Sequence, residues 1–246
     1  LNSSSALFEE PENLLKQEVR EPSLYNAIIS AIASGASKLS EISTKVGENS
    51  STCTAYLKNL ISLGLIRRET PYGEKNSKKT IYTVEDNMFR FWYRFIPDNA
   101  SLIVRGASDL AYQRIRPQLS DYMGKIFEDI CTQYLWQLLN GKSPVFFKEL
   151  GRWWGTDPAT HAQTEIDIMG EQDKNTALFC ECKWTNDLVD SGVLELLVHR
   201  SQLFHYNSTH LFLFSKNGFT SGCTEMAEKL GNVTLVSYSD IYGSCQ

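Results

Sequence analysis

Two charged residues lie inside an apolar run in the second half of the chain. Residues 176–184 read TALFCECKW, a run apolar enough to form a buried strand, yet it contains Glu181 and Lys183. Side chains alternate along a strand, so residues at this spacing point to the same face of a sheet. A buried carboxylate and a buried ammonium are costly unless they pair with each other or bind an ion. The spacing therefore indicates either a structural ion pair or a site that uses both charges.

A second carboxylate is expected beside this pair. Asp167 lies in the run TEIDIMG, and the short turn EQDKN after it predicts an antiparallel hairpin with the strand at 176–184. Such a hairpin can bring Asp167 next to Glu181 and Lys183, and two carboxylates at one sheet edge suit Mg²⁺ or Mn²⁺. The ammonium of Lys183 would offset their charge and orient or help deprotonate an attacking water. The chemistry predicted for these groups is metal-assisted attack of water on phosphorus.

The neighbours of these residues allow further interpretations. Glu165 shares the face of Asp167 in a regular strand, and we expect a solvated residue there rather than a further ligand. Cys180 and Cys182 point to the face opposite Glu181, and we expect buried thiols rather than zinc ligands. The histidines form no pattern of the H-E-x-x-H type; they are His161, His199, His205 and His210.

Residues 121–246 alternate helices and strands. The apolar runs predict, in chain order, a helix, three strands, a helix, a strand, a helix and a strand. Their ranges are 121–140, 143–150, 162–170, 176–184, 192–206, 209–215, 221–231 and 232–239. This order predicts an α/β domain in which a mixed sheet is flanked by helices.

Residues 21–85 predict a smaller α+β domain. Three short helices are expected at 22–35, 38–47 and 48–64, and each of them ends at a glycine. Two strand-like runs follow within 65–84, around a turn rich in Pro, Gly, Asn and Ser. Three helices followed by a hairpin is the element order of a winged helix-turn-helix.

Basic residues are concentrated on or beside this hairpin, which is the wing of the domain. Two acidic residues, Glu69 and Glu74, lower the net charge of the wing to +3, so it can reach DNA phosphates. The basic residues of the wing are Arg67, Arg68, Lys75, Lys78 and Lys79. The third helix adds Lys58 among short polar side chains, so its readout of bases would be modest. A winged helix that contacts protein instead of DNA is the alternative.

Two further segments complete the organisation. Residues 1–20 are polar and acidic, with a helical piece, and we expect them to be a linker. Residues 86–120 form an aromatic-rich connector that contains FRFWYRF, and we expect its rings to pack one domain on the other rather than stack on bases. The chain lacks an initiating Met and begins in polar sequence, which we interpret as a fragment or a processed product.

Charge and composition limit which cellular compartment and which binding partners we expect for this chain. Residues 1–120 hold 15 Lys and Arg against 13 Asp and Glu, whereas residues 121–246 hold 9 against 16. The first part is therefore suited to a polyanion such as DNA, and the second part concentrates carboxylates. We find no run of 18 apolar residues and no signal peptide, so we expect no membrane partner. The six cysteines form no disulfide framework, which favours a cytoplasmic protein.

The charged pattern of the second domain resembles the PD-(D/E)XK nuclease superfamily. Asp167 is followed 14 residues later by Glu181-Cys182-Lys183, which is similar to the D…E-x-K core of that superfamily. The run GKIFE supplies Glu128 on the helix before the sheet, and Gln202 and Tyr206 fit the Q-x-x-x-Y of RecB-like members. The resemblance implies a restriction-endonuclease-like fold, a Mg²⁺ or Mn²⁺ cofactor and catalytic roles for these residues. The alternatives are an exposed helix residue at Glu128 and simple helix packing at Gln202 and Tyr206.

The chain as a whole also resembles the C-terminal half of a prokaryotic ATPase family common in archaea. The resemblance covers about residues 8–240 and includes the winged helix, the FWYRF connector and the nuclease-like module. It implies a P-loop ATPase domain before these modules, yet nothing in this chain fits G-x-x-x-x-G-K-[ST]. The ATP-binding domain would then lie outside this chain as a partner, and residues 1–20 would be the tail of its lid.

These observations predict a two-domain chain that hydrolyses DNA. The winged helix would bind DNA, and Asp167 and Glu181 would hold the divalent metal ion. The alternative is a catalytically inactive DNA-binding or assembly module that regulates the ATPase domain. Assembly into an oligomer is compatible with the sequence, and the preferred DNA structure is left open.

Overall fold

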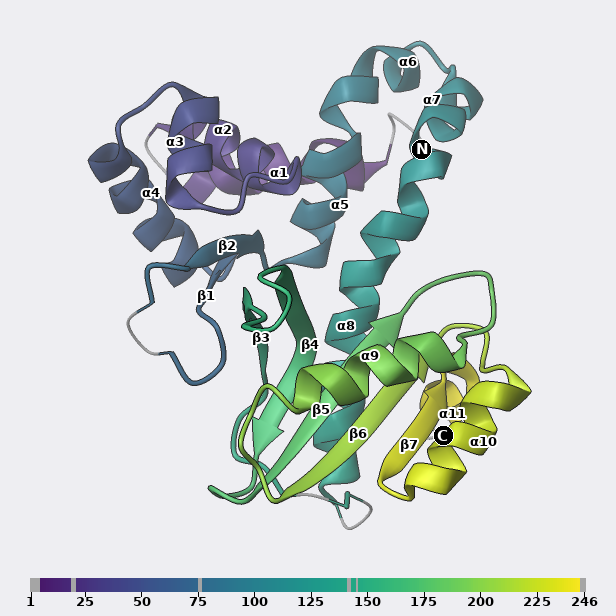
Figure 1. Ribbon diagram of the computed structural model, residues 1–246. Helices are drawn as coiled ribbons and strands as arrows, with labels where there is room; N and C mark the ends of the chain where they lie inside the picture. Colours follow the sequence, from purple (N-terminus) through teal and green to yellow (C-terminus); the bar gives the residue numbers. More distant parts are fainter. Residues whose placement is uncertain (1–4, 19–20, 75–76, 141–142, 145, 244–246) are drawn as a thin grey trace. The chain divides into compact units, whose positions relative to one another are not determined.

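A computed structural model describes residues 5–18, 21–74, 77–140, 143–144 and 146–243 (Figure 1). Contacts between residues divide the chain into two units. The first comprises Leu1–Thr70 and Lys75–Pro117, and the second comprises Pro71–Glu74 and Gln118–Gln246. No helix among the described residues is long and apolar enough to cross a membrane.

The first unit has the element order expected of a winged helix-turn-helix. Its first four helices are α1 (Ala6–Glu18), α2 (Pro22–Ala33), α3 (Leu39–Val46) and α4 (Ser50–Ser62). The antiparallel hairpin of β1 (Ile66–Glu69) and β2 (Ile81–Val84) follows. Three more helices and a 3₁₀ turn complete the unit: α5 (Asn87–Phe95), η1 (Pro97–Asn99), α6 (Ala100–Val104) and α7 (Ser108–Ile115).

Side-chain caps and one core explain these elements. The side chain of Asn49 caps α4 by accepting the N–H of Thr52 at 2.8 Å, and Asp86 caps α5 in the same way. The rings of Phe89, Trp92 and Tyr93 are buried in the same core as α2. Buried rings are not available to bases, so packing is the role of this aromatic segment. These rings belong to the first unit's own core, and the expected packing of one domain on the other stays a prediction.

The second unit is a mixed α/β fold. The 3₁₀ turn η2 (Arg116–Gln118) joins the two units, and in the second unit α8 (Leu119–Leu138) precedes a five-stranded sheet of order β3-β4-β5-β6-β7. The strands are β3 (Gly151–Thr156), β4 (Gln163–Glu171), β5 (Thr176–Lys183), β6 (Ser208–Ser215) and β7 (Val233–Ser237). The β3–β4 and β4–β5 pairs are antiparallel, whereas β5–β6 and β6–β7 are parallel. This confirms the mixed sheet flanked by helices.

Helices cover both faces of the sheet. On one face α8 and α11 (Tyr238–Gly243) pack with Leu178 and Cys180 of β5, and we call this the α8 face. On the other, α9 (Ser191–Ser201) and α10 (Ser221–Leu230) pack with Ala177 and Phe179, and we call this the α9 face. Figure 1 shows α9 and α10 in front of the sheet and α8 behind it. The alternation along β5 is that of a regular strand.

Two predicted elements were wrong. The described residues of 143–150 form no strand, and the first strand of the sheet begins at Gly151. Phe147 is buried and Phe146 is 64% exposed, but the described residues of this segment pair with no strand. The helix predicted at 192–206 ends at Ser201, because the N–H groups of Leu203 and Phe204 bond three residues back instead of four.

Candidate functional site

An irregularity in β4 sets the position of Asp167. Between two paired positions β3 advances two residues, from Gly151 to Trp153, while β4 advances three, from Met169 to Ile166. One residue of β4 is therefore extra, as in a β-bulge. Ile166 packs on the α9 face and Ile168 on the α8 face, although a regular strand would put both on one face. The extra residue thus lies at Asp167, between the two.

Asp167 is a buried carboxylate among other carboxylates. It is 6% exposed, and its Oδ2 accepts a hydrogen bond from the backbone N–H of Cys182 at 2.8 Å. Burial, together with the nearby carboxylates of Glu181 and Glu128, raises the pKa of Asp167 to about 7. The hairpin predicted between Asp167 and Glu181 is confirmed by the antiparallel β4–β5 pairing, in which Ile168 pairs with Cys180.

Both carboxylate oxygens of Glu181 contact cations. Oε1 lies 2.6 Å from Nζ of Lys183, and Oε2 lies 2.7 Å from Nη1 of Arg200 on α9. The Glu181 side chain is 4% exposed, whereas those of Lys183 and Arg200 are 34% and 14% exposed. Burial lowers the pKa of Lys183, but the carboxylate of Glu181 outweighs it and the net pKa is raised. Lys183 is therefore an ammonium at neutral pH, suited to stabilising negative charge and not to deprotonating water.

Arg200 was missed by the sequence analysis. It lies 19 residues after Glu181. The apolar pattern of its helix predicts which face is buried but does not predict a contact with a residue of β5. One signal was available: a buried carboxylate has two oxygens that need hydrogen-bond donors, and the ammonium of Lys183 bonds to one of them. That signal calls for a second donor without saying which residue supplies it.

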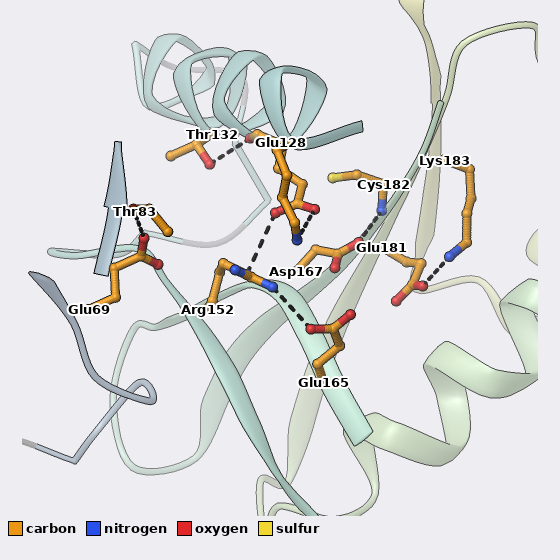
Figure 2. Close-up of polar contacts among 11 residues, drawn as sticks. Glu69, Thr83, Glu128, Thr132, Arg152, Glu165, Asp167, Glu181, Cys182 and Lys183 are labelled. Atoms are coloured by element: carbon orange, nitrogen blue, oxygen red, sulfur yellow. Dashed lines mark hydrogen bonds and ion pairs between the residues drawn. The ribbon is translucent and has the colours of Figure 1, made fainter. Parts of the chain in front are cut away.

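A second group of charges lies toward α8 (Figure 2). Arg152 of β3 connects two carboxylates, with Nε 3.6 Å from Oε2 of Glu128 and Nη2 3.0 Å from Oε2 of Glu165. Glu128 also accepts from Lys125 Nζ at 2.8 Å. The Glu165 side chain is 51% exposed, in agreement with a solvated residue. That it shares the face of Asp167 stays a prediction, because the extra residue in β4 interrupts the regular alternation between the two.

The structure does not bring Gln202 and Tyr206 to these carboxylates. Gln202 follows the last residue of α9 and is exposed. The hydroxyl of Tyr206 bonds to Glu171, which pairs with Ala177 at the opposite end of β5 from Glu181. Four residues of strand separate Ala177 from Glu181, about 13 Å. The Q-x-x-x-Y spacing therefore does not form a helical motif here.

A buried aspartate and a histidine form a pair that the sequence did not reveal. Oδ2 of Asp157 lies 2.7 Å from Nε2 of His199, the residue before Arg200. The bond to His199 and the N–H of Ala159 lower the pKa of Asp157 to about 2. Asp157 also closes the turn after β3, where its N–H donates to Ala162 and its C=O accepts from His161. The pair thus fixes the last turn of α9 to this turn.

A divalent cation fits the donor chemistry of Asp167 and Glu181. A carboxylate offers about four lone-pair positions, and Glu181 uses two of them for N–H donors, so both residues retain hard oxygen donors. Within the described ranges, no group of three or more His, Cys, Asp or Glu side chains could hold a metal ion. Backbone carbonyls, water or substrate would complete the coordination of such an ion. Burial raises the pKa of Cys180 and of Cys182, so these thiols stay protonated.

The predicted DNA-binding residues differ in their surroundings. Arg67 forms ion pairs, with Nε 3.0 Å from Glu69 and Nη1 3.1 Å from Glu85, so its charge is already neutralised. The other basic residues described are exposed: Lys58, Arg68, Lys78 and Lys79. Lys75 lies outside the described residues.

Comparisons with known proteins match part of this chain. Residues 92–195 match the family DUF234, described as archaeal and bacterial proteins of unknown function. The uncharacterized protein MJECL04 of Methanocaldococcus jannaschii is 38% identical over 195 residues, which are 78% of this chain and 42% of that protein. The chain thus spans less than half the length of this relative.

Solved structures show weaker similarities. Protein VC1899 from Vibrio cholerae is 12% identical, with 98% of this chain and 55% of that chain covered and a TM-score of 0.36. NadR in complex with 4-hydroxyphenylacetate is 16% identical, with 49% and 84% covered and a TM-score of 0.29. TM-scores this low do not indicate a shared fold. The segment that matches DUF234 contains Glu128, Asp167, Glu181 and Lys183 and stops before Arg200.

Proposed function

We propose that this chain binds DNA and hydrolyses its phosphodiester bonds with one Mg²⁺ or Mn²⁺ ion held by Asp167 and Glu181. The surroundings of Asp167 carry the proposal. This carboxylate is buried beside Glu181 and Glu128, and its pKa is raised to about 7, first by burial and then by the negative charges of these two neighbours. A divalent cation relieves such repulsion, and a perturbed carboxylate of this kind is typical of functional sites.

Each side chain would have a separate role. The cation, when bound, would supply Lewis-acid activation of water and of the phosphate. Lys183, an ammonium 34% exposed, would stabilise the charge that develops on phosphorus. Arg200, which is 14% exposed, would hold Glu181 in position. Glu128, already paired with Lys125 and Arg152, would shape the field around Asp167 without binding the ion.

The first unit supports the DNA-binding part of the proposal. Its helices and hairpin follow the winged helix-turn-helix order, and Arg68 and Lys78 are exposed on β1 and in the turn of the hairpin. Lys58 is exposed on α4, the helix that enters the major groove in this class of domain. Because Arg67 is paired, the wing would contact fewer phosphates than its sequence indicates. The P-loop ATPase that the sequence resemblance implies is likewise proposed as part of a longer protein.

Cleavage assays with matched variants test the proposal. The purified chain is incubated with Mg²⁺ or Mn²⁺ on single-stranded, duplex and branched DNA. We expect cleavage by the parent and by Glu165→Gln, and loss of cleavage in Asp167→Asn and Lys183→Met. Glu165 is the control because it is a half-exposed carboxylate of the same strand. If the parent and Asp167→Asn cleave DNA equally, the nuclease activity does not depend on Asp167 and comes from another site or from a contaminant.

A second candidate function rests on the two cations around Glu181. Both oxygens of Glu181 are bonded, at 2.6 Å to Lys183 and at 2.7 Å to Arg200. Such an ion network is also compatible with a purely structural role in an inactive DNA-binding module. This alternative predicts no cleavage and no change in melting temperature with Mn²⁺. It also predicts that Lys183→Met changes stability and no activity.

A further inference from the structure

Three aromatic side chains form a row at one edge of the sheet in the second unit. The rings of Trp184 and Tyr238 lie 5.7 Å apart, nearly perpendicular, and those of Tyr238 and Tyr242 lie 6.5 Å apart and 29° from parallel. The buried ring of Phe127 supports Trp184 from below, at 5.2 Å. Tyr238 is 39% exposed and Tyr242 is 63% exposed. The row therefore extends from the core of the α8 face into solvent.

The row lies where the parallel strands end. Lys183 pairs with Ser215 and Ser215 with Ser237, so the last residues of β5, β6 and β7 are aligned. The residues that directly follow these strand ends are Trp184 after β5, Lys216 after β6 and Tyr238 after β7. Open α/β sheets bind ligands at the carboxyl ends of their strands. These three side chains therefore begin from one aligned edge, with Trp184 on the α8 face and Glu181 and Lys183 on the α9 face of the same strand end.

The charges around the row are few and mixed. Lys216 Nζ lies 5.0 Å from the centre of the Trp184 ring and donates to Asn186 Oδ1 at 2.7 Å. Opposite charge is supplied by Asp240, whose carboxylate accepts from Ser237, and by exposed Asp187. A ligand bound at this edge would therefore be held more by contacts with the aromatic rings than by contacts with charged side chains.

We propose that Trp184, Tyr238 and Tyr242 are a stacking platform for the bases of a single-stranded nucleic acid. Unpaired bases stack on exposed aromatic rings, whereas bases inside a duplex do not present their faces. Lys216 and Lys183 would contact phosphates of the same strand. The inference rests on the proposed function, because it specifies the substrate class of that site: a single strand that crosses the strand ends from the rings on the α8 face to Lys183 on the α9 face.

Fluorescence anisotropy of a labelled single-stranded oligonucleotide, in EDTA, tests the platform without any cleavage. The full chain is titrated as parent, Tyr242→Ala, Tyr242→Leu, Tyr242→Phe and Tyr112→Ala. Tyr112, 51% exposed on α7 of the first unit, is the matched control. Loss of one stacked base should weaken binding between about fivefold and about 150-fold in Tyr242→Ala and Tyr242→Leu. Tyr242→Phe and Tyr112→Ala should bind as the parent does. Leucine keeps apolar bulk but no planar ring, so it separates stacking from packing.

Other readouts separate this inference from the proposed hydrolysis. Duplex binding should be unchanged in Tyr242→Ala, and the salt dependence of single-strand binding should be weak, with a slope of about −0.7 for each phosphate contact. Ring-dependent binding without cleavage in Mn²⁺ would support the platform and overturn the hydrolysis. A parent that does not bind the oligonucleotide, or equal affinity of parent and Tyr242→Ala, would overturn the platform. So would concentration-dependent self-association that Tyr242→Ala abolishes while oligonucleotide binding is unchanged, because the rings would then contact protein.

Discussion

Arg200 Nη1 lies 2.7 Å from Oε2 of Glu181, so a helix that follows β5 supplies the second cation for a carboxylate buried in that strand. Lys183 supplies the first at 2.6 Å, from two residues along the same strand. The two cations are not equivalent, because the Arg200 side chain is 14% exposed and that of Lys183 is 34% exposed. This difference assigns structural support of Glu181 to Arg200 and leaves Lys183 more accessible to solvent and, in the proposed function, to substrate.

Arg200→Met should destabilise the second unit strongly. Removing one partner of a buried ion pair leaves an uncompensated charge, and the typical loss is about 3–5 kcal/mol. Lys183→Met should cost less, because Lys183 is more exposed and Glu181 keeps Arg200. Urea unfolding measures both, with Arg105→Met as a control at an exposed arginine of the first unit. Adding Glu181→Gln to Arg200→Met should restore part of the loss; no recovery would mean that Arg200 acts through packing.

The stability of the second unit should fall as the pH rises through about 7. The pKa of Asp167 is raised from an ordinary 3.8 to about 7, so the folded state binds a proton that the unfolded state releases. The stabilisation is fully present below about pH 4 and is lost as the pH rises, by at most about 1.4 kcal/mol per pH unit. Urea unfolding of the parent and Asp167→Asn at pH 5, 6, 7 and 8, with a chelator, measures the difference. A difference that is constant with pH would contradict the assignment.

Duplex DNA binding should depend on Arg68 and Lys78 and not on Arg67. Each phosphate contact contributes about 0.9 to the slope of log affinity against log salt, so the double variant Arg68→Gln, Lys78→Gln should lower the slope by about 2. Arg67→Gln is the matched control, because its guanidinium is paired with Glu69 and Glu85. Anisotropy titrations at several salt concentrations measure the slopes. Equal slopes for parent and double variant would show that the wing does not contact phosphates.

Local patterns in the sequence predicted the parts of the site that depend on one hairpin. The turn between Asp167 and Glu181 and the alternation in TALFCECKW were sufficient to place β4 beside β5 and to put Glu181 and Lys183 on one face. The mixed sheet followed from the order of its elements. Each of these inferences needs only neighbours in the chain, and periodicity reports such neighbours well.

The parts that failed depend on distant partners. The extra residue at Asp167 is defined by the pairing of β4 with β3, and β3 was itself misplaced because the apolar residues of segment 143–150 are typical of a strand. Ser201 ends α9 without a glycine or a proline, so no stop signal marked the end of that helix. Arg200 contacts Glu181 in β5, 19 residues away in the sequence. His199 contacts Asp157, directly after β3, at a separation of 42 residues. Such contacts are properties of the packed fold and not of any local spacing.

Titration calorimetry with Mn²⁺ tests the central claim, that Asp167 and Glu181 together hold one divalent cation. The parent should bind one ion, and Lys183→Met should retain binding because the lysine is not a ligand. Asp167→Asn should lose it, because a neutral amide does not replace the charge that holds a hard cation. Glu165→Gln, outside the proposed ligand set, should bind as the parent does. Absence of binding heat in the parent, or equal affinity of the parent and Asp167→Asn, would contradict the claim.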